Sequence, residues 1–400
     1  MKDKARRGIG GAWESFEEQD PYNPELTIKG FINRSPKGRG YGALHITEIN
    51  GVETDQFIWA TPKMLYPYVD DPHTGEMRIE FPPISKIKVF EKMDGTNILA
   101  YSYLDHEGKT RISYKTRLRP FLSEGRFGNF KALWNDILET HPDIPDLVMK
   151  NECNLSFELY GKKNHHMVIY EVVLEASFLF GVGPSEDGKT SVLVAPDDLE
   201  RGSLDFPQII RVIDEDTELS VAYNDVRAWL DENINIKTTD DVDEDDTVTG
   251  MEGAVWYTYS KDGRLLQYKC KPEYVQDMHF AASGKIPIHS IKATITNAFE
   301  DRDDPDYDYI VELLREEYSD EKIYKKEIVI RRELDRIKHR RKVQARVWEV
   351  YQESGLDFTV DKPQVMRMIA TEMLAEYPRG HPHRKKVSQI AFNYLESVFG

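Results

Sequence analysis

The organising stretch of this sequence is Val89-Phe90-Glu91-Lys92-Met93-Asp94-Gly95-Thr96-Asn97. Lys92 ends an apolar, β-like run, and Asp94 and Gly95 follow it at once. A lysine that acts as a nucleophile needs a pocket that lowers its pKa and a backbone that presents it rigidly. A glycine permits the turn that such a presentation requires. A surface hairpin turn is the alternative interpretation, so the choice depends on the rest of the chain.

Length and composition indicate a folded protein of more than one unit. The chain has 400 residues, for which two or three packed units are expected. Hydrophobic residues make up 40% of it, including 21 tyrosines and 17 phenylalanines, which argues against extensive disorder. The formal net charge of -17 excludes a protein that coats nucleic acid over its whole surface, but it leaves room for a local basic groove.

Cysteine content and hydropathy bear on the compartment. Cys153 and Cys270 are too few for a disulfide framework or a tetrahedral zinc site, which favours a reducing compartment, although these two could still pair. The basic N-terminus has no apolar core behind it, and no long apolar run occurs elsewhere. We therefore expect an intracellular, cytoplasmic protein with no membrane partner.

Short β-like runs precede the Lys92 stretch. Residues 1 to about 23 are rich in glycine and charge and are predicted to be a tail. The runs at 26–32, 42–49 and 56–60 are separated by Gly, Pro and Asn-Gly, which predicts a small sheet. Arg34, Lys37 and Arg39 lie in its first loop, where a solvated turn is favoured over a phosphate contact.

The region after Lys92 is predominantly β. Its predicted strands cover residues 98–103, 110–117, 155–161, 168–173, 177–182, 208–213, 250–257 and 265–272, and its predicted helices cover residues 130–139 and 219–233. His165-His166 lacks matching ligands nearby and is interpreted as a loop rather than a metal site. The acidic run at 240–246 is interpreted as a solvated loop.

Several of these strands carry charged residues in unusual places. Glu158 lies in the middle of an apolar strand, where a carboxylate is costly unless a cation or a donor meets it. Lys269 and Lys271 share one face of their strand by alternation, and they repel each other unless an anion lies between them. Lys115, Arg117 and Arg119 form a basic cluster that an ordinary charged strand end would also explain.

Aromatic residues follow the same alternation. Phe178 and Phe180 are predicted to lie on one face of their strand, with core packing favoured over stacking on a purine.

From about residue 276 the pattern is helical. Candidate helices cover residues 290–299, 307–318, 321–352, 362–377 and 384–399. Within residues 321–347, eleven Lys or Arg stand against four acids, which a solvated helix explains about as well as a nucleic-acid surface. A homodimer through this helical region is a further expectation.

The charged residues occur in a fixed order along the β-rich region: Lys92 with Asp-Gly, the basic cluster, Glu158, the aromatic strand, Glu252-Gly253 and Lys269-x-Lys271. Over residues 85–275 this order resembles the covalent nucleotidyltransferase superfamily of ATP-dependent ligases and mRNA capping enzymes. Asn97 is similar to the last position of the Lys-x-(Asp/His)-Gly-x-Asn motif of RNA ligases, including those of bacteriophages. The helical region after Lys271 also differs from the β-rich OB domain of DNA ligases and capping enzymes.

The resemblance implies an α+β fold with three parts. These are an N-terminal tail and small β-rich module at 1–60, an antiparallel-sheet nucleotidyltransferase domain of the ATP-grasp-like ligase type at 61–275, and an all-helical C-terminal domain at 276–400.

The resemblance also implies an ATP-dependent RNA ligase that works in three steps. Lys92 would attack the α-phosphate of ATP and keep AMP as a lysyl-AMP intermediate, and the AMP would pass to an RNA 5′-phosphate. A 3′-hydroxyl of RNA would then displace it, so the partner is RNA with these two kinds of end. Lys269 and Lys271 would lower the pKa of Lys92 and hold phosphate charge.

A metal ion and further contacts follow from the same resemblance. Mg²⁺, or Mn²⁺ as a substitute, would be associated with Glu252, because phosphates and oxygen ligands suit a hard cation. The family pattern places Glu158 and Asn97 near the ribose, Arg117 near phosphate, Phe180 against adenine and Glu91 at the adenine edge. A phage-encoded protein would act in the host cytoplasm.

Three other functions compete with this one. A capping guanylyltransferase would label with GTP, and a DNA ligase would seal nicked DNA. A catalytically inactive RNA-binding protein would bind RNA through the helix at 322–346 without forming a nucleotidyl-enzyme.

Overall fold

The computed structural model describes most of the chain: residues 9–35, 40–70, 77–122, 129–164, 166, 168–186, 188, 190–214, 217–233, 235–237, 247–249, 251–261, 263–272, 286, 288–315, 318, 320–377 and 384–399. The chain splits into two compact units, which we call unit 1 (Met1–Glu124 and Phe130–Ser283) and unit 2 (Gly125–Asn129 and Gly284–Gly400). Lys37, Arg39, His165 and the acidic run at 240–246 lie outside the described residues.

An antiparallel sheet forms the N-terminal part of unit 1. Its strands follow one another in sequence as β1 (Trp13–Gln19), β2 (Thr27–Asn33), β3 (Leu44–Ile49) and β4 (Val52–Ile58). The predicted tail was wrong for β1, which pairs with β2 along its whole length. As an edge strand with mostly exposed residues, β1 keeps only Trp13 and Phe16 against the core, so its sequence lacks an apolar alternation.

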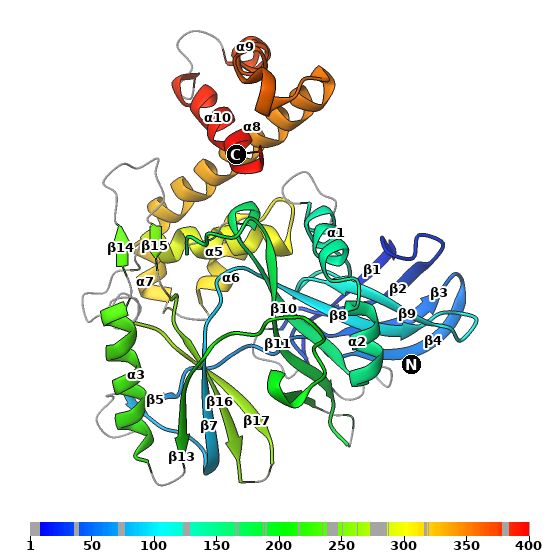
Figure 1. Cartoon of the computed structure of the whole chain (residues 1–400), viewed down its shortest axis with the longest axis vertical. Helices are drawn as coiled ribbons and strands as arrows, with labels where there is room; N and C mark the ends of the chain where they lie inside the picture. Colours follow the sequence, from blue (N-terminus) through cyan, green and yellow to red (C-terminus); the bar gives the residue numbers. More distant parts are fainter. Residues whose placement is uncertain are drawn as a thin grey trace. The chain divides into compact units, whose positions relative to one another are not determined.

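Two further antiparallel sheets form the rest of the core of unit 1 (Figure 1). The larger has the order β12-β11-β10-β8-β9, and the smaller has the order β13-β7-β16-β17. Their bounds are β7 (Ile84–Glu91), β8 (Thr96–Leu104), β9 (Thr110–Lys115), β10 (Asn154–Tyr160), β11 (Glu175–Pro184), β12 (Ser191–Val194), β13 (Ile209–Asp214), β16 (Ala254–Ser260) and β17 (Leu265–Cys270). Two short pairs lie outside them: β5 (Tyr68–Asp70) with β6 (Met77–Ile79), and β14 (Asn235–Lys237) with β15 (Thr247–Thr249).

Amphipathic helices pack on each of these two sheets. Helices α1 (Phe130–Thr140) and α2 (Ile144–Asn151) bury their apolar residues in one cluster with β8, β10 and β11. Helix α3 (Leu219–Asn233) does the same with β7 and β16, where Tyr223 packs 5.3 Å from Trp256 between ring centroids. The helices therefore cover one face of each of these two sheets.

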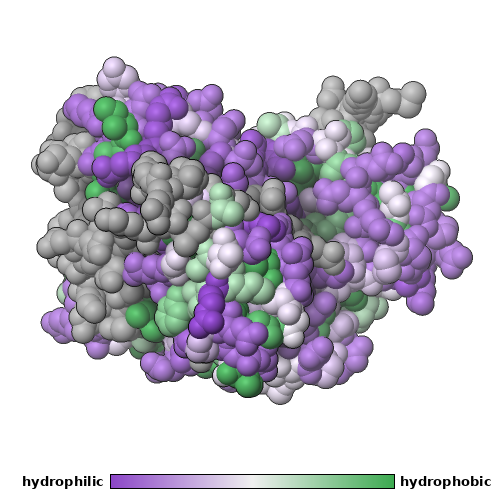
Figure 2. Space-filling view, turned by 90° about the horizontal axis from the view of Figure 1, so that it is seen from above, coloured by the Kyte–Doolittle hydropathy of each residue, from purple (hydrophilic) through white to green (hydrophobic). Residues whose placement is uncertain are grey.

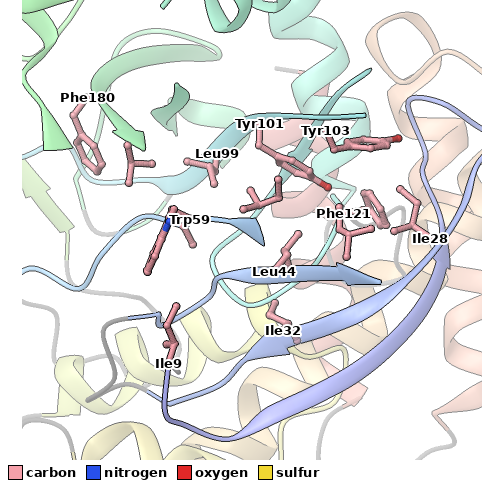
Figure 3. Packing of buried hydrophobic residues seen from close by; sticks show 14 of the residues in the cluster. Ile9, Ile28, Ile32, Leu44, Trp59, Leu99, Tyr101, Tyr103, Phe121 and Phe180 are labelled. Carbon is pink, nitrogen blue, oxygen red and sulfur yellow. The ribbon is translucent and has the colours of Figure 1, made fainter. Parts of the chain in front are cut away.

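The N-terminal sheet shares its core with the larger sheet. Ile28, Ile32 and Leu44 of β2 and β3 face Tyr101 and Tyr103 of β8 in Figure 3, and all five are buried. Burial of such side chains contributes about 1.5–3 kcal/mol each. The N-terminal sheet is thus packed as part of unit 1.

Two strand predictions in unit 1 were wrong in detail. Residues 168–173 form no strand in the described chain, and Val172 and Val173 are 42% and 59% exposed. In β11, a register shift opposite Ser156 and Phe157 breaks the alternation, so Phe178 and Phe180 belong to different hydrophobic clusters instead of one face.

Unit 2 is helical in its described part. Its helices are α5 (Ile288–Asp301), α6 (Tyr307–Leu314), α7 (Asp320–Tyr324), α8 (Glu327–Ser354), α9 (Phe358–Glu376) and α10 (Arg384–Phe399). One continuous helix over residues 321–352 was the wrong prediction, because α7 ends at Tyr324 and α8 begins at Glu327. The first part of α8 packs with α5 and α6, and its last part packs with α9 and α10.

The described chain is therefore α+β, with antiparallel sheets and a helical C-terminal region, as the sequence predicted. None of its described helices combines the length and apolarity needed to cross a membrane. On the face shown in Figure 2, hydrophilic residues prevail and hydrophobic ones form small separate patches.

Candidate active site

Lys92 lies where the chain crosses from one large sheet to the other. Strand β7 of the smaller sheet ends at Glu91, and β8 of the larger sheet begins at Thr96. The Lys92 backbone N–H donates to the Gly253 carbonyl (2.9 Å). Backbone contacts on both sides of the crossing therefore present Lys92 from a fixed position.

The loop after β10 holds the other side of this crossing. The Asp94 N–H donates to the Tyr170 hydroxyl (2.9 Å), and the Asp94 carboxylate accepts from the Val168 N–H (2.6 Å). The Thr96 hydroxyl lies 3.1 Å from His166 Nε2, so His166 belongs to this loop network. The sequence offered no signal for Tyr170, since it lies in a segment predicted as a strand.

Gly95 is required for close packing rather than for an unusual turn. Its φ is not positive, so conformational freedom, the role predicted from sequence, is not what the position uses. A Cβ at this position would lie 2.2 Å from the Leu159 carbonyl oxygen and 3.2 Å from Cγ of Glu158. Only glycine lets the crossing approach β10 so closely, which brings Lys92 near Glu158.

Glu252 joins two lysines in one ionic group. Lys92 Nζ contacts one carboxylate oxygen, and Lys271 Nζ lies 3.1 Å from the other. The Glu252 side chain is only 6% exposed. Burial alone would raise its pKa, but the charges and hydrogen bonds of the two lysines outweigh burial and lower the pKa to about 2. Glu252 is therefore ionised at neutral pH.

Lys269 has different surroundings from Lys271. Its Nζ lies 4.4 Å from the centroid of the Tyr66 ring, a cation–π contact that stabilises the ammonium. The Lys269 backbone N–H donates to the Leu65 carbonyl (2.9 Å). Tyr66 was missed because it lies in a proline-rich link that shows no periodic pattern.

Glu158 and Asn97 are register partners on β10 and β8. Burial raises the pKa of Glu158 to about 7, against the lowering effect of Lys92 and Arg117. Asn97 Nδ2 donates to Ser156 Oγ (2.9 Å) and to the Phe157 carbonyl (3.1 Å). Its Oδ1 atom is buried and accepts no hydrogen bond within the part of the chain that the structure describes. The acceptor end of this amide is therefore open to a ligand donor.

Arg117 also has a polar atom open to a ligand. Its Nε is buried and has no hydrogen-bond partner among the described residues. Its guanidinium carbon lies 5.7 Å from the centroid of the Tyr41 ring. An N–H group in this position could donate to an anion such as a phosphate oxygen.

Glu91 and Phe180 lie on different sheets, at the end of β7 and within β11. Glu91 is the last residue of β7, and burial raises its pKa. Phe180 is 3% exposed and shares a cluster with Phe90, Val255 and Tyr257. Without a ligand, Phe180 is thus a core residue.

The residues can hold a metal ion only with the help of a ligand. In the described ranges, no group of three or more His, Cys, Asp or Glu is arranged to bind a metal. Glu252 offers one ionised carboxylate, and one or two carboxylates together with substrate phosphates are the usual ligands of Mg²⁺. The donor set therefore fits Mg²⁺ brought in with a nucleotide.

Comparisons with known proteins found only weak structural similarity. No protein-family model matches the sequence, and no curated protein matches it. A solved structure titled "Archaeal ATP-dependent RNA ligase - form 1" is similar at 14% identity and a TM-score of 0.40, over 96% of this chain and 92% of that one. Form 2 of that title is similar at 13% identity and a TM-score of 0.40, over 99% and 95%. Similarity at this level carries no argument about function, which rests on the site.

Proposed function

We propose that the protein is an ATP-dependent RNA ligase that forms a lysyl-AMP intermediate on Lys92. The observation that carries this proposal is the ionic group in which the partly buried Lys92 and Lys271 meet on the buried Glu252, beside the crossing between the two sheets. A lysine held on a rigid crossing among other cations is suited to attack an anionic phosphorus centre.

Three lysines take part in the first step, the formation of lysyl-AMP. Lys92 Nζ, once deprotonated, attacks the α-phosphate, the new N–P bond forms, and the bond to pyrophosphate breaks. Lys271 binds the opposite oxygen of Glu252 and so adds positive charge beside Lys92. Lys269, whose ammonium lies over the Tyr66 ring, adds positive charge for the phosphates. Mg²⁺ would neutralise further phosphate charge when bound.

The nucleotide fits the two open polar atoms of the site. The buried Asn97 Oδ1 can accept from a ribose hydroxyl, and the buried Arg117 Nε can donate to a phosphate. Glu158, with a pKa of about 7, can bind a hydroxyl in either protonation state. Phe180 would stack against the base, and Glu91 would lie at its edge. In the later steps an RNA 5′-phosphate takes AMP from Lys92, and a 3′-hydroxyl of RNA then attacks that phosphate, so that the phosphodiester bond forms and AMP leaves.

The experiment is to incubate the protein with α-labelled ATP and Mg²⁺ and to measure acid-labile label on the chain. We expect labelling by the parent protein and by Lys86→Ala, an exposed lysine on the same strand as the Lys92 crossing. Lys92→Ala should show none. Equal labelling of Lys92→Ala and the parent, or no label on either, would contradict the proposal.

The same assay separates the competing enzymes. Preference for α-labelled GTP would identify a capping guanylyltransferase. Sealing of nicked DNA at least as fast as RNA would identify a DNA ligase. RNA joining without either outcome supports the RNA ligase.

A further inference from the structure

The N-terminal part of the chain contacts residues of the candidate site, or their direct neighbours, at two places. We use "N-terminal module" for residues 9–61, which include β1 to β4. One contact is the turn at Tyr41 and Gly42, and the other is the segment from Trp59 to Thr61 that follows β4. Neither place contains a residue with a part in the proposed chemistry. The first contacts Arg117 directly, and the second is linked to Asn97 through Ser156.

The first contact depends on the buried lysine at the end of β9. Lys115 is 0% exposed. Its Nζ donates to the carbonyl oxygens of Thr116 (2.7 Å), Arg117 (2.8 Å) and Gly42 (3.1 Å). A buried ammonium is costly, and three carbonyl acceptors offset that cost only while their geometry is kept. Lys115 therefore fastens the backbone of Arg117 to the N-terminal module.

The Tyr41–Gly42 turn fits closely against the same arginine. Gly42 has a φ of 79°, and a Cβ there would lie 2.4 Å from the Arg117 carbonyl oxygen and 3.0 Å from Arg117 Cγ. The buried Tyr41 ring lies beside the Arg117 guanidinium. Backbone and side chain of Arg117 are thus both held by the module.

The second contact is a chain of hydroxyl and amide groups. The Thr61 and Ser156 hydroxyls are both buried and lie 3.2 Å apart. Ser156 Oγ accepts from Asn97 Nδ2, so its own proton is available to Thr61. Asn154 Nδ2 donates to the Trp59 carbonyl (2.9 Å) and fixes the same segment. This chain keeps the Asn97 amide turned so that Oδ1 stays open.

We propose that the N-terminal module is a positioning element of the nucleotide site, in which Lys115 sets Arg117, and Thr61 with Ser156 sets Asn97. The inference rests on the proposed function and deepens it, because it assigns a role in nucleotide binding to a part of the chain that carries none of the motif residues. Lys115, Thr61 and Ser156 act through their partners and do not touch the nucleotide.

The test measures kcat and KM for ATP in enzyme adenylylation by the full chain. Lys115→Met removes the ammonium, and Thr61→Val removes only a hydroxyl. We expect both to lower kcat/KM, Lys115→Met by about 100-fold, since displacing a positioning group by about 1 Å costs that much. The exposed Lys109→Met, in the turn just before the same strand, is the matched control and should behave as the parent.

Double variants distinguish positioning from general damage. If Lys115 acts through Arg117, then adding Lys115→Met to Arg117→Ala produces little further loss, and Thr61→Val adds little to Asn97→Ala. Full additivity in both pairs, or parent-like kinetics in both single variants, would overturn the inference. If Lys115→Met does not fold, the Thr61→Val pair decides.

Failure of the proposed function gives a different result. In that case the parent protein itself takes no label, whereas failure of this inference leaves the parent active and the variants unaffected or additive.

Discussion

The candidate site and helix α8 are both rich in cations, but their cations are arranged differently. At the site, Lys92 and Lys271 come from separate strands and meet on one buried carboxylate. Along α8, cations pair with acids close by on the same helix, as in Arg331 with Glu327, Arg346 with Glu349, and both Arg332 and Arg336 with the buried Glu333. Lys338 pairs with Asp304, which is 78% exposed.

Cations brought together from distant parts of the chain therefore indicate a binding site better than the number of cations does. Exposed pairs one turn apart on a helix contribute about 0.3–0.5 kcal/mol and need no ligand to explain them. Two ammonium groups that share one carboxylate leave a net positive charge, which an anionic ligand would offset. The local pairing favours the solvated-helix interpretation of α8.

Among the substitutions at the site and on α8, replacing Glu252 should have the largest effect on stability and adenylylation. Glu252→Gln leaves the partly buried Lys92 and Lys271 without their anion, so we expect a loss of about 1–3 kcal/mol in the free energy of unfolding. Adenylylation should fall by at least about 100-fold. Denaturant unfolding and the labelling assay measure the two effects, with the exposed Glu53→Gln as control. A variant as stable as the parent would show that the ionic group is not buried as described.

Glu158 should give a smaller effect with a characteristic pH dependence. Its pKa is about 7 in the folded protein against 4.5 ordinarily, so the folded state holds its proton more tightly. That contribution to stability is fully present below about pH 4.5 and is lost as pH rises through about 7. Glu158→Gln stays neutral, so its Tm should rise relative to that of the parent by about 1–2 °C per kcal/mol between about pH 5 and pH 8.

The control for this measurement is Glu139→Gln, an exposed glutamate at the end of α1. Its Tm difference from the parent should stay constant over the same pH range. A constant difference for Glu158→Gln as well would mean that Glu158 titrates as an ordinary surface carboxyl.

The smallest effect is expected on α8. Arg346→Gln breaks an exposed pair with Glu349 and should change the free energy of unfolding by about 0.5 kcal/mol or less. Adenylylation should not change. RNA affinity of Arg346→Gln and of the parent, measured at several salt concentrations, tests α8 directly. A clear fall in RNA affinity would identify α8 as a nucleic-acid surface and contradict the solvated-helix interpretation.

The sequence predicted the parts of the fold that have strong local patterns. β10, β16, β17 and helices α1 and α3 follow from periodicity. Lys92, Glu252 and Lys271, which the structure brings together, were chosen from the order of motifs. These three residues are far apart in the sequence and lie close together because they flank the ends of paired strands β7, β16 and β17.

Other features could not be predicted because their causes are not local. β1 is polar because it is an edge strand, and only pairing with β2 identifies it. The separation of Phe178 from Phe180 depends on an irregularity that is visible only against β10. Lys115 looked like part of a charged strand end, since nothing in its neighbours shows that three carbonyls surround it.

The position of Lys92 between the sheets also has a mechanical consequence. The Lys92–Gly95 crossing is a short covalent link between the smaller and the larger sheet. For any rotation of one sheet against the other about this link, displacement grows with distance from the pivot and is smallest at the pivot itself. Any such rotation would therefore move Lys92 less than residues farther along either sheet.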